Sequence, residues 1–120
     1  MAVTVFNISG GTVNVKAVTA IEPAQEIQTV AVGKDTRLAL RVSNGNAAGI
    51  IVRVKAGDGP RAPLGDNDVP VAANAEGYIA LYDTARYKSG NVITVVLVDS
   101  AGTALDSESL GAVQIEAVQL

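Results

Sequence analysis

Two neighbouring stretches of this sequence alternate between apolar and polar residues: TRLALRVS at residues 36–43 and GIIVRVK at residues 49–55. In the first, Leu38, Leu40 and Val42 share one face of an extended chain, and the arginines lie on the other. A period of two is typical of a half-buried β-strand. The residues between them, NGN at 44–46, tolerate positive φ and predict a turn. We therefore predict a β-hairpin across residues 36–55.

Further extended segments lie on both sides of this hairpin, at residues 3–8, 12–18, 26–32, 77–82, 91–98 and 113–118. The segment 91–98 is apolar on both faces, which favours a central strand or one half-exposed at a subunit contact. Seven to nine short strands separated by turns predict an all-β protein, either a single antiparallel β-sandwich or a small barrel. A chain of 120 residues fits one domain, 1–120.

Three other segments lack the alternating pattern of a β-strand. Residues 57–70 contain three prolines and three glycines, which predicts an unusually long loop of the kind that often carries function. Residues 83–88 favour a single helical turn after the strand at 77–82. The segment 104–110 fits either a short helix or a polar edge strand.

The composition excludes several classes of function. The chain has no histidine, cysteine or tryptophan, although 48% of it is hydrophobic, and its net charge is −3. Cysteine-free chains form neither disulfides nor thiolate metal sites. An acidic chain with only four aromatic residues does not suit nucleic acid. The N-terminal residues lack a basic segment, and the longest apolar run, 92–98, is too short for a membrane helix, so we predict neither a signal peptide nor membrane association.

Two acidic clusters have the composition of a site. Asp58, Asp66 and Asp68 lie in the long loop, where Asx residues could ligate calcium, but turns select the same residues without any metal. Asp106 and Glu108 flank a serine, but no base accompanies the hydroxyl and no aromatic platform accompanies the carboxylates. We therefore predict no catalysis and no cofactor or metal.

Tyr78 and Tyr82 share one face of the strand at 77–82. Such a pair is able to form a sugar-stacking or partner-binding surface. Core or edge packing is the simpler interpretation, and the sequence does not decide between them.

From residue 38 onward, the order of features resembles a group of small β-proteins encoded beside the major capsid gene of tailed bacteriophages. The resemblance rests on a strand ending in an Asn-Gly turn (38–45), a second strand (50–54), the element PVA (70–72), the segment LYDTARY (81–87) and the strand VITV (92–95). It covers about two thirds of the chain, and DTARY is its most particular motif. Residues 99–111 form a longer stretch than the group usually has.

This resemblance implies a non-catalytic virion structural protein, such as a capsid decoration or cement protein, assembled in the host cytoplasm. The expected partner is the capsid or another virion protein lattice, with the chain acting as a monomer or a trimer. The alternatives are an immunoglobulin-like, carbohydrate-binding or adhesion module, and a phage tail or head-completion component. The predicted contacts lie in the long loop and in the tip that follows the strand at 77–82: Asp58, Arg61, Asp66, Asp68, Tyr82, Arg86, Tyr87 and Lys88.

Overall fold

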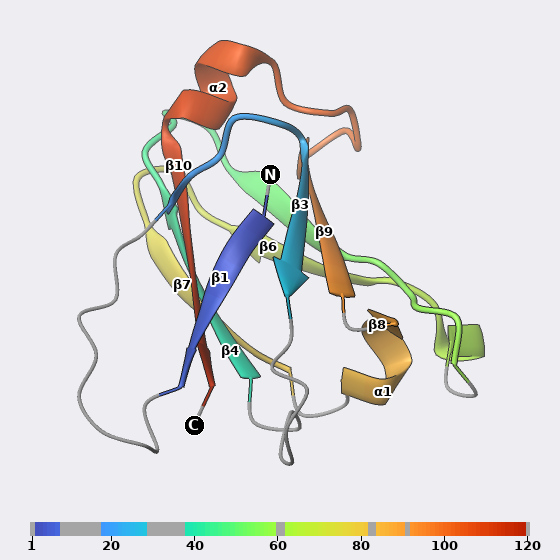
Figure 1. The fold of residues 1–120 in the computed structure, drawn as a ribbon. Helices are drawn as coiled ribbons and strands as arrows, with labels where there is room; N and C mark the ends of the chain where they lie inside the picture. The colour runs from blue at the N-terminus through green and yellow to red at the C-terminus, as the bar shows by residue number, and fades with distance from the viewer. Residues whose placement is uncertain are drawn as a thin grey trace.

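The structure is a computed structural model that describes residues 2–7, 18–28, 38–59, 62–81, 84–90 and 92–119. Two β-sheets face each other across a hydrophobic core (Figure 1). The all-β fold class predicted from the sequence is confirmed. None of the helices in these ranges is long and apolar enough to cross a membrane.

One sheet contains the strands β6 (Asn67–Val71), β5 (Ile50–Val54), β9 (Val92–Asp99) and β3 (Ala24–Gln28), in that order. All of its pairings among these strands are antiparallel. The strand β9 lies between β5 and β3, so the predicted central position is confirmed, although its second face is only partly buried. Its inward residues Ile93, Val95 and Leu97 are fully buried.

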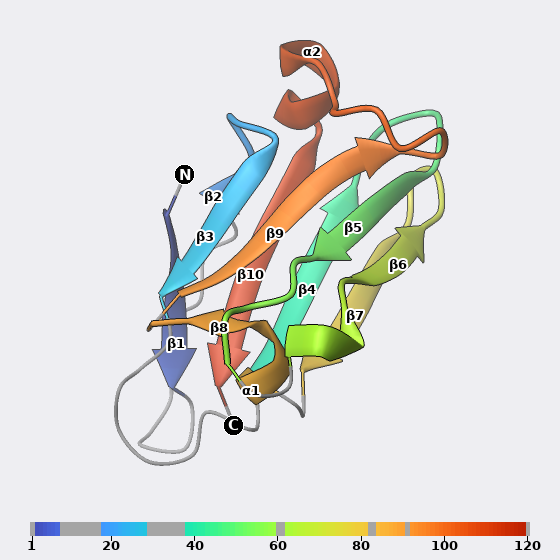
Figure 2. The ribbon, with the colours of Figure 1, turned by 90° about the vertical axis from the view of Figure 1, so that its right-hand side faces the viewer.

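The second sheet contains β10 (Val113–Gln119), β4 (Leu38–Asn44) and β7 (Glu76–Leu81), again antiparallel (Figure 2). In β4 every second residue is buried, as the alternation in the sequence predicts. The strand β7 ends this sheet, as β6 ends the other.

The strand β1 (Ala2–Asn7) joins the two sheets along one side of the sandwich. Its first half pairs with β3 and its second half pairs with β10, both in parallel orientation. Two short strands of two residues each, β2 (Val18–Thr19) and β8 (Lys88–Ser89), pair in antiparallel orientation with β10 and β9, respectively. On the opposite side, β6 and β7 are the end strands of the two sheets among the described residues, and no strand pairing connects them.

The predicted hairpin between residues 36–43 and 49–55 is wrong. The strands β4 and β5 belong to opposite sheets, so the residues between them cross over the end of the sandwich. The side chain of Asn44, only 1% exposed, explains this arrangement. Its amide nitrogen donates to the carbonyls of Ala48 (3.0 Å) and Ala72 (3.1 Å), and its Oδ1 accepts from the Asn46 amide (3.0 Å). These bonds hold the β4–β5 crossing against the neighbouring β6–β7 crossing.

The predicted loop 57–70 is partly wrong as well. Residues 62–64 form the 3-10 turn η1 (Ala62–Leu64), and residues 67–71 form the strand β6, paired with β5. Pro70 lies inside this strand, where a missing N–H is tolerated because the strand is at a sheet edge. The helical turn after β7 is confirmed as α1 (Thr84–Tyr87), and the segment 104–110 contains the helix α2 (Ser107–Gly111). The predicted strand at 12–18 lies mostly outside the described residues.

Candidate functional site

The predicted contact residues that the structure describes lie at one end of the sandwich, around η1 and α1. Figure 2 draws these two short helical segments side by side, at the opposite end of the sandwich from α2. Asp58, Asp66 and Asp68 come from the segments before and after η1, and Arg86 and Lys88 from α1 and β8. Arg61 and Tyr82 lie outside the described residues. The fold therefore brings two segments about 20 residues apart to one surface, which we call the η1 surface.

Arg86 fixes the shape of the η1 surface. Its Nε donates to the carbonyl of Gly65 at 2.9 Å, and its Nη2 donates to the carbonyls of Leu64 (3.2 Å) and Asp66 (3.1 Å). Gly65 has a φ of 83°, in the left-handed region that glycine adopts without steric cost. A guanidinium is rigid and planar and carries several donors, so one side chain satisfies three successive carbonyls. Its Cζ also lies 5.0 Å from the centre of the Tyr87 ring.

Backbone hydrogen bonds attach the other side of the loop to the same helical turn. The amide of Gly57 donates to the Arg86 carbonyl at 2.9 Å, and the amide of Asp58 donates to the Lys88 carbonyl at 3.3 Å. The hydroxyl of Ser89 donates to Asp58 Oδ2 at 3.0 Å. The loop is thus bonded to α1 and β8 on both sides of η1.

The carboxylates of this surface accept hydrogen bonds from different donors. Asp66 accepts from the Ala56 amide (2.7 Å) and from Lys55 Nζ (2.9 Å), and these two bonds lower its pKa below the ordinary value. Asp68 accepts from Arg53 Nε at 2.8 Å, and this hydrogen bond lowers its pKa in the same direction. Their oxygens face separate cations, and the described residues contain no group of three acidic residues able to hold a metal ion.

Tyr87 requires a correction, because it is only 6% exposed and belongs to the hydrophobic core. A side chain buried inside the sandwich offers no surface to a partner, so its predicted role as a contact is wrong. Among the described residues of the η1 surface, Leu64 is an exposed large hydrophobic side chain, at 57% exposure, and it was not predicted as a contact. Its signal in the sequence was an isolated leucine between a proline and a glycine in an otherwise polar stretch.

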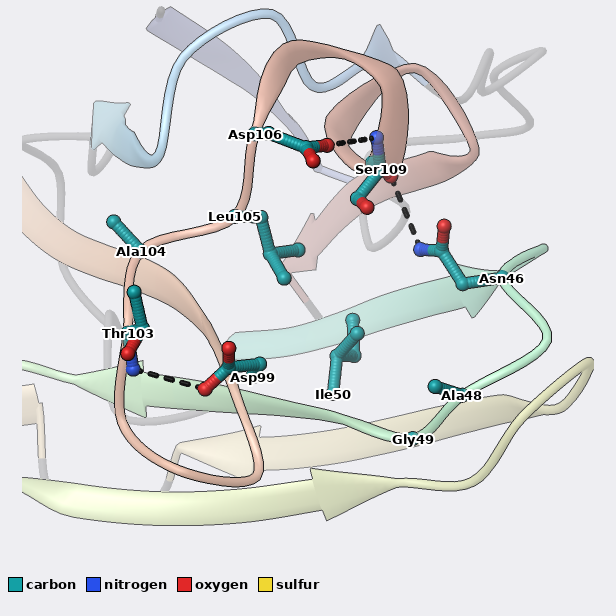
Figure 3. A pocket seen from close by; sticks show the side chains of 10 residues that line it. All are labelled: Asn46, Ala48, Gly49, Ile50, Asp99, Thr103, Ala104, Leu105, Asp106 and Ser109. Carbon is teal, nitrogen blue, oxygen red and sulfur yellow. Dashed lines mark hydrogen bonds between the residues drawn. The ribbon is translucent and has the colours of Figure 1, made fainter.

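A pocket of about 380 Å³ lies at the opposite end of the sandwich, beneath α2 (Figure 3). Its polar side chains are committed to local structure. Asp99 Oδ1 accepts from the Thr103 amide at 2.9 Å, and Asp106 Oδ1 accepts from the Ser109 amide at 2.8 Å as the N-cap of α2. The lining consists of Asn46, Ala48, Gly49, Ile50, Asp99, Thr103, Ala104, Leu105, Asp106 and Ser109.

Asp106 therefore acts as a helix cap, which follows from the preference of aspartate for this position. Hydrogen bonds from the backbone amide of Ser109 and from its side chain lower the pKa of Asp106, so this carboxylate is ionised at neutral pH. A carboxylate that is ionised and occupied by an amide is a poor proton donor at neutral pH. Among the described residues that line the pocket, there is neither a nucleophile paired with a base nor an aromatic ring.

No family model matches this chain, and no curated protein or solved structure is significantly similar to it.

Proposed function

We propose that this chain is a non-catalytic virion structural protein that attaches to a phage capsid lattice through the η1 surface. The resemblance to small β-proteins encoded beside the major capsid gene motivates this proposal. A chain without histidine, cysteine or tryptophan has few means of catalysis, while a surface of fixed shape is sufficient for binding a lattice. In this role the protein is part of the virion and assembles onto it in the host cytoplasm.

Leu64 is the observation that carries the proposal. It is 57% exposed on a turn whose carbonyls accept hydrogen bonds from one arginine, and Asp66 follows it two residues later in the chain. Stable protein interfaces place an apolar contact at the centre and polar residues at the rim. A turn that is already fixed loses little conformational entropy on binding, so its contacts contribute more to the affinity. Leu64 is therefore the proposed anchor, with Asp58, Asp66 and Lys88 at the rim.

Co-sedimentation with assembled heads of the phage whose genome encodes the chain tests this function. The wild-type chain should pellet with the heads, and Leu64→Asp should weaken the association at least tenfold, as expected for a central anchor. The matched control is Ile21→Asp, because Ile21 is also exposed (66%) but lies in the β2–β3 connection. Failure of the wild-type chain to pellet at any salt concentration, or equal losses for the two variants, would overturn the proposal.

The pocket beneath α2 is the feature closest to the carbohydrate-binding alternative. Its lining includes the amide of Asn46, the carboxylates of Asp99 and Asp106, and the apolar side chains of Ile50 and Leu105. However, ligand pockets usually add aromatic side chains to such polar groups, and this lining has none. A glycan array with and without calcium tests the alternative, and binding of any glycan that Asn46→Ala abolishes would favour it over the virion role.

A further inference from the structure

The two sheet edges on the open side of the sandwich differ in how well they are protected. A strand at a sheet edge presents unpaired N–H and C=O groups, and natural proteins cover such edges or interrupt them with proline and charge. Both edge strands carry an acidic residue paired with an arginine of the neighbouring strand, Asp68 with Arg53 on β6 and Glu76 with Arg41 on β7. The difference is Pro70, which interrupts β6. The strand β7 has no proline, and among the described residues β4 is the strand that pairs with it.

The register shows which backbone groups of β7 are free. The amide of Asn44 donates to the carbonyl of Ala75, so this pair faces inward between β4 and β7. Hydrogen-bonding direction alternates along an antiparallel strand. Gly77, Ile79 and Leu81 therefore bond to β4, while Glu76, Tyr78 and Ala80 direct their N–H and C=O groups away from it. The same three residues have exposed side chains, with Tyr78 at 75%.

This edge is self-complementary about Tyr78. In an antiparallel pairing of two β7 strands centred on that residue, Tyr78 faces its own copy and Glu76 faces Ala80 of the other chain. Opposed tyrosines form a favourable cross-strand pair, and no charge meets a like charge directly. The two Glu76 side chains lie four residues apart along the strands, about 13 Å. Glu76 is moreover already paired with Arg41, at 2.7 Å.

We propose that β7 is the contact of a two-fold homodimer, in which the β4–β7 sheets of two chains join into one continuous sheet. The occupant of the edge is a second copy of this chain, because the strand matches itself in both hydrogen-bond register and charge. A two-fold axis at Tyr78 closes the assembly, since both chains use the same β7 edge, which is free among the described strands. The inward side chains of Ile79 and Leu81 stay in the core, so dimerisation requires no refolding.

A single cysteine tests the predicted register, because the chain contains no other. Opposed residues in an antiparallel pair lie within the Cα separation that a disulfide accepts. Under mild oxidation Tyr78→Cys should therefore form a covalent dimer in minutes at micromolar concentration. The matched control, Asp68→Cys, places an exposed thiol on the β6 edge and should stay monomeric. Cross-linking of both variants at equal rates would show random collision and would overturn the register.

The charge of residue 80 provides a second test that does not depend on cross-linking. Ala80→Glu places a carboxylate opposite Glu76 of the second chain, whereas Ala80→Lys places a cation there. Because each dimer contains this pair twice, sedimentation equilibrium should give a dissociation constant roughly tenfold higher for the glutamate variant than for the lysine variant. A wild-type chain that sediments as a monomer at hundreds of micromolar contradicts the dimer. It leaves the proposed attachment through Leu64 untouched, since that residue lies on another surface.

Discussion

The guanidinium of Arg86 donates to the carbonyl of Gly65 at 2.9 Å and joins two segments that are 21 residues apart. This contact belongs to α1, whose own sequence gives no indication of it. The same side chain reaches the carbonyls on both sides of Gly65, so one residue sets the shape of the η1 turn. The stability of the η1 surface should therefore depend on this arginine more than on any ion pair around it.

Replacing Arg86 tests this dependence. Arg86→Ala removes the donors of three carbonyls and should lower the free energy of unfolding by about 1–2 kcal/mol. Arg86→Lys should recover only part of the loss, because an ammonium lacks the planar fork of donors. Urea denaturation measures the stability, and hydrogen exchange should show faster exchange at residues 62–67.

The matched control for this series is Arg53→Ala on β5. Arg53 forms an exposed ion pair with Asp68, and exposed pairs contribute little because water screens them. Its removal should change stability less than the loss of Arg86. Equal effects of the two alanine variants would contradict the role assigned to Arg86.

Gly57 should tolerate no side chain. A Cβ at this position would lie 2.0 Å from the Lys88 carbonyl oxygen, and this neighbour is backbone rather than a flexible side chain. Gly57→Ala should therefore destabilise the fold by about 1–3 kcal/mol through overpacking. Gly111→Ala, in α2, is the control: nothing lies within 4 Å of its Cβ, and it should gain about 0.5–1 kcal/mol. Thermal unfolding of both variants should shift the melting temperature in opposite directions.

Asn44 should be essential for the two crossings between the sheets. Asn44→Ala leaves a buried amide and carbonyls without partners and should cost more than about 2 kcal/mol. Asn44→Asp should be worse, because a carboxylate cannot donate to the carbonyls of Ala48 and Ala72. Ser43→Ala, one residue earlier in β4, serves as the control and should remain close to wild type. Denaturant titration measures the free energy of unfolding of each variant. If Asn44→Asp is as stable as Ser43→Ala, the role proposed for Asn44 is excluded.

The stability of the fold should fall in acid. The pKa values of Asp66, Asp68 and Asp106 are lowered in the folded chain by the hydrogen bonds that they accept. As the pH falls, the unfolded chain therefore binds protons at a higher pH than the folded chain does. The stabilisation from these three carboxylates is fully present above about pH 5 and is lost as the pH drops through their folded pKa values. The chain contains no histidine and no cysteine, so its melting temperature should change little between pH 5 and 8.

The variant Asp106→Asn removes the negative charge of residue 106 but keeps its hydrogen bond as the N-cap of α2. Asparagine accepts at the N-cap nearly as well as aspartate but does not titrate in this range. Its melting temperature should fall less steeply below pH 5 than that of the wild-type chain. Identical acid profiles would falsify the contribution of Asp106, and differential scanning fluorimetry from pH 7 to 2.5 measures both.

Most of the strands followed from local pattern, because burial on one face imposes a period of two wherever a sheet covers a core. The alternation in β4 and the C-terminal β10 were predicted from this rule, whereas the central β9 was predicted from a run that is apolar on both faces. The pairing of β4 with β5 was predicted wrongly. A short turn between two alternating strands fits a hairpin and a crossing between sheets equally well, and the buried amide of Asn44 selects the crossing.

The candidate site was predicted only in outline. Asx-rich and glycine-rich segments pointed to the end of the sandwich that contains η1, because turns and exposed loops select those residues. Tyr87 was assigned to the surface although it belongs to the core, and Leu64 was missed although it is exposed. One helical turn gives too few residues to show which of them face inward.

The sequence alone determined that this protein is built from strands and that its chemistry is restricted to carboxylates, amides, hydroxyls and a few cations. Both properties depend on composition and local periodicity, which are independent of how the strands pair. Only the tertiary structure decided which strands share a sheet, that Arg86 holds the η1 turn, and that β7 has a free edge among the described strands. Those features depend on contacts between residues far apart in the chain, and local pattern carries no record of such contacts.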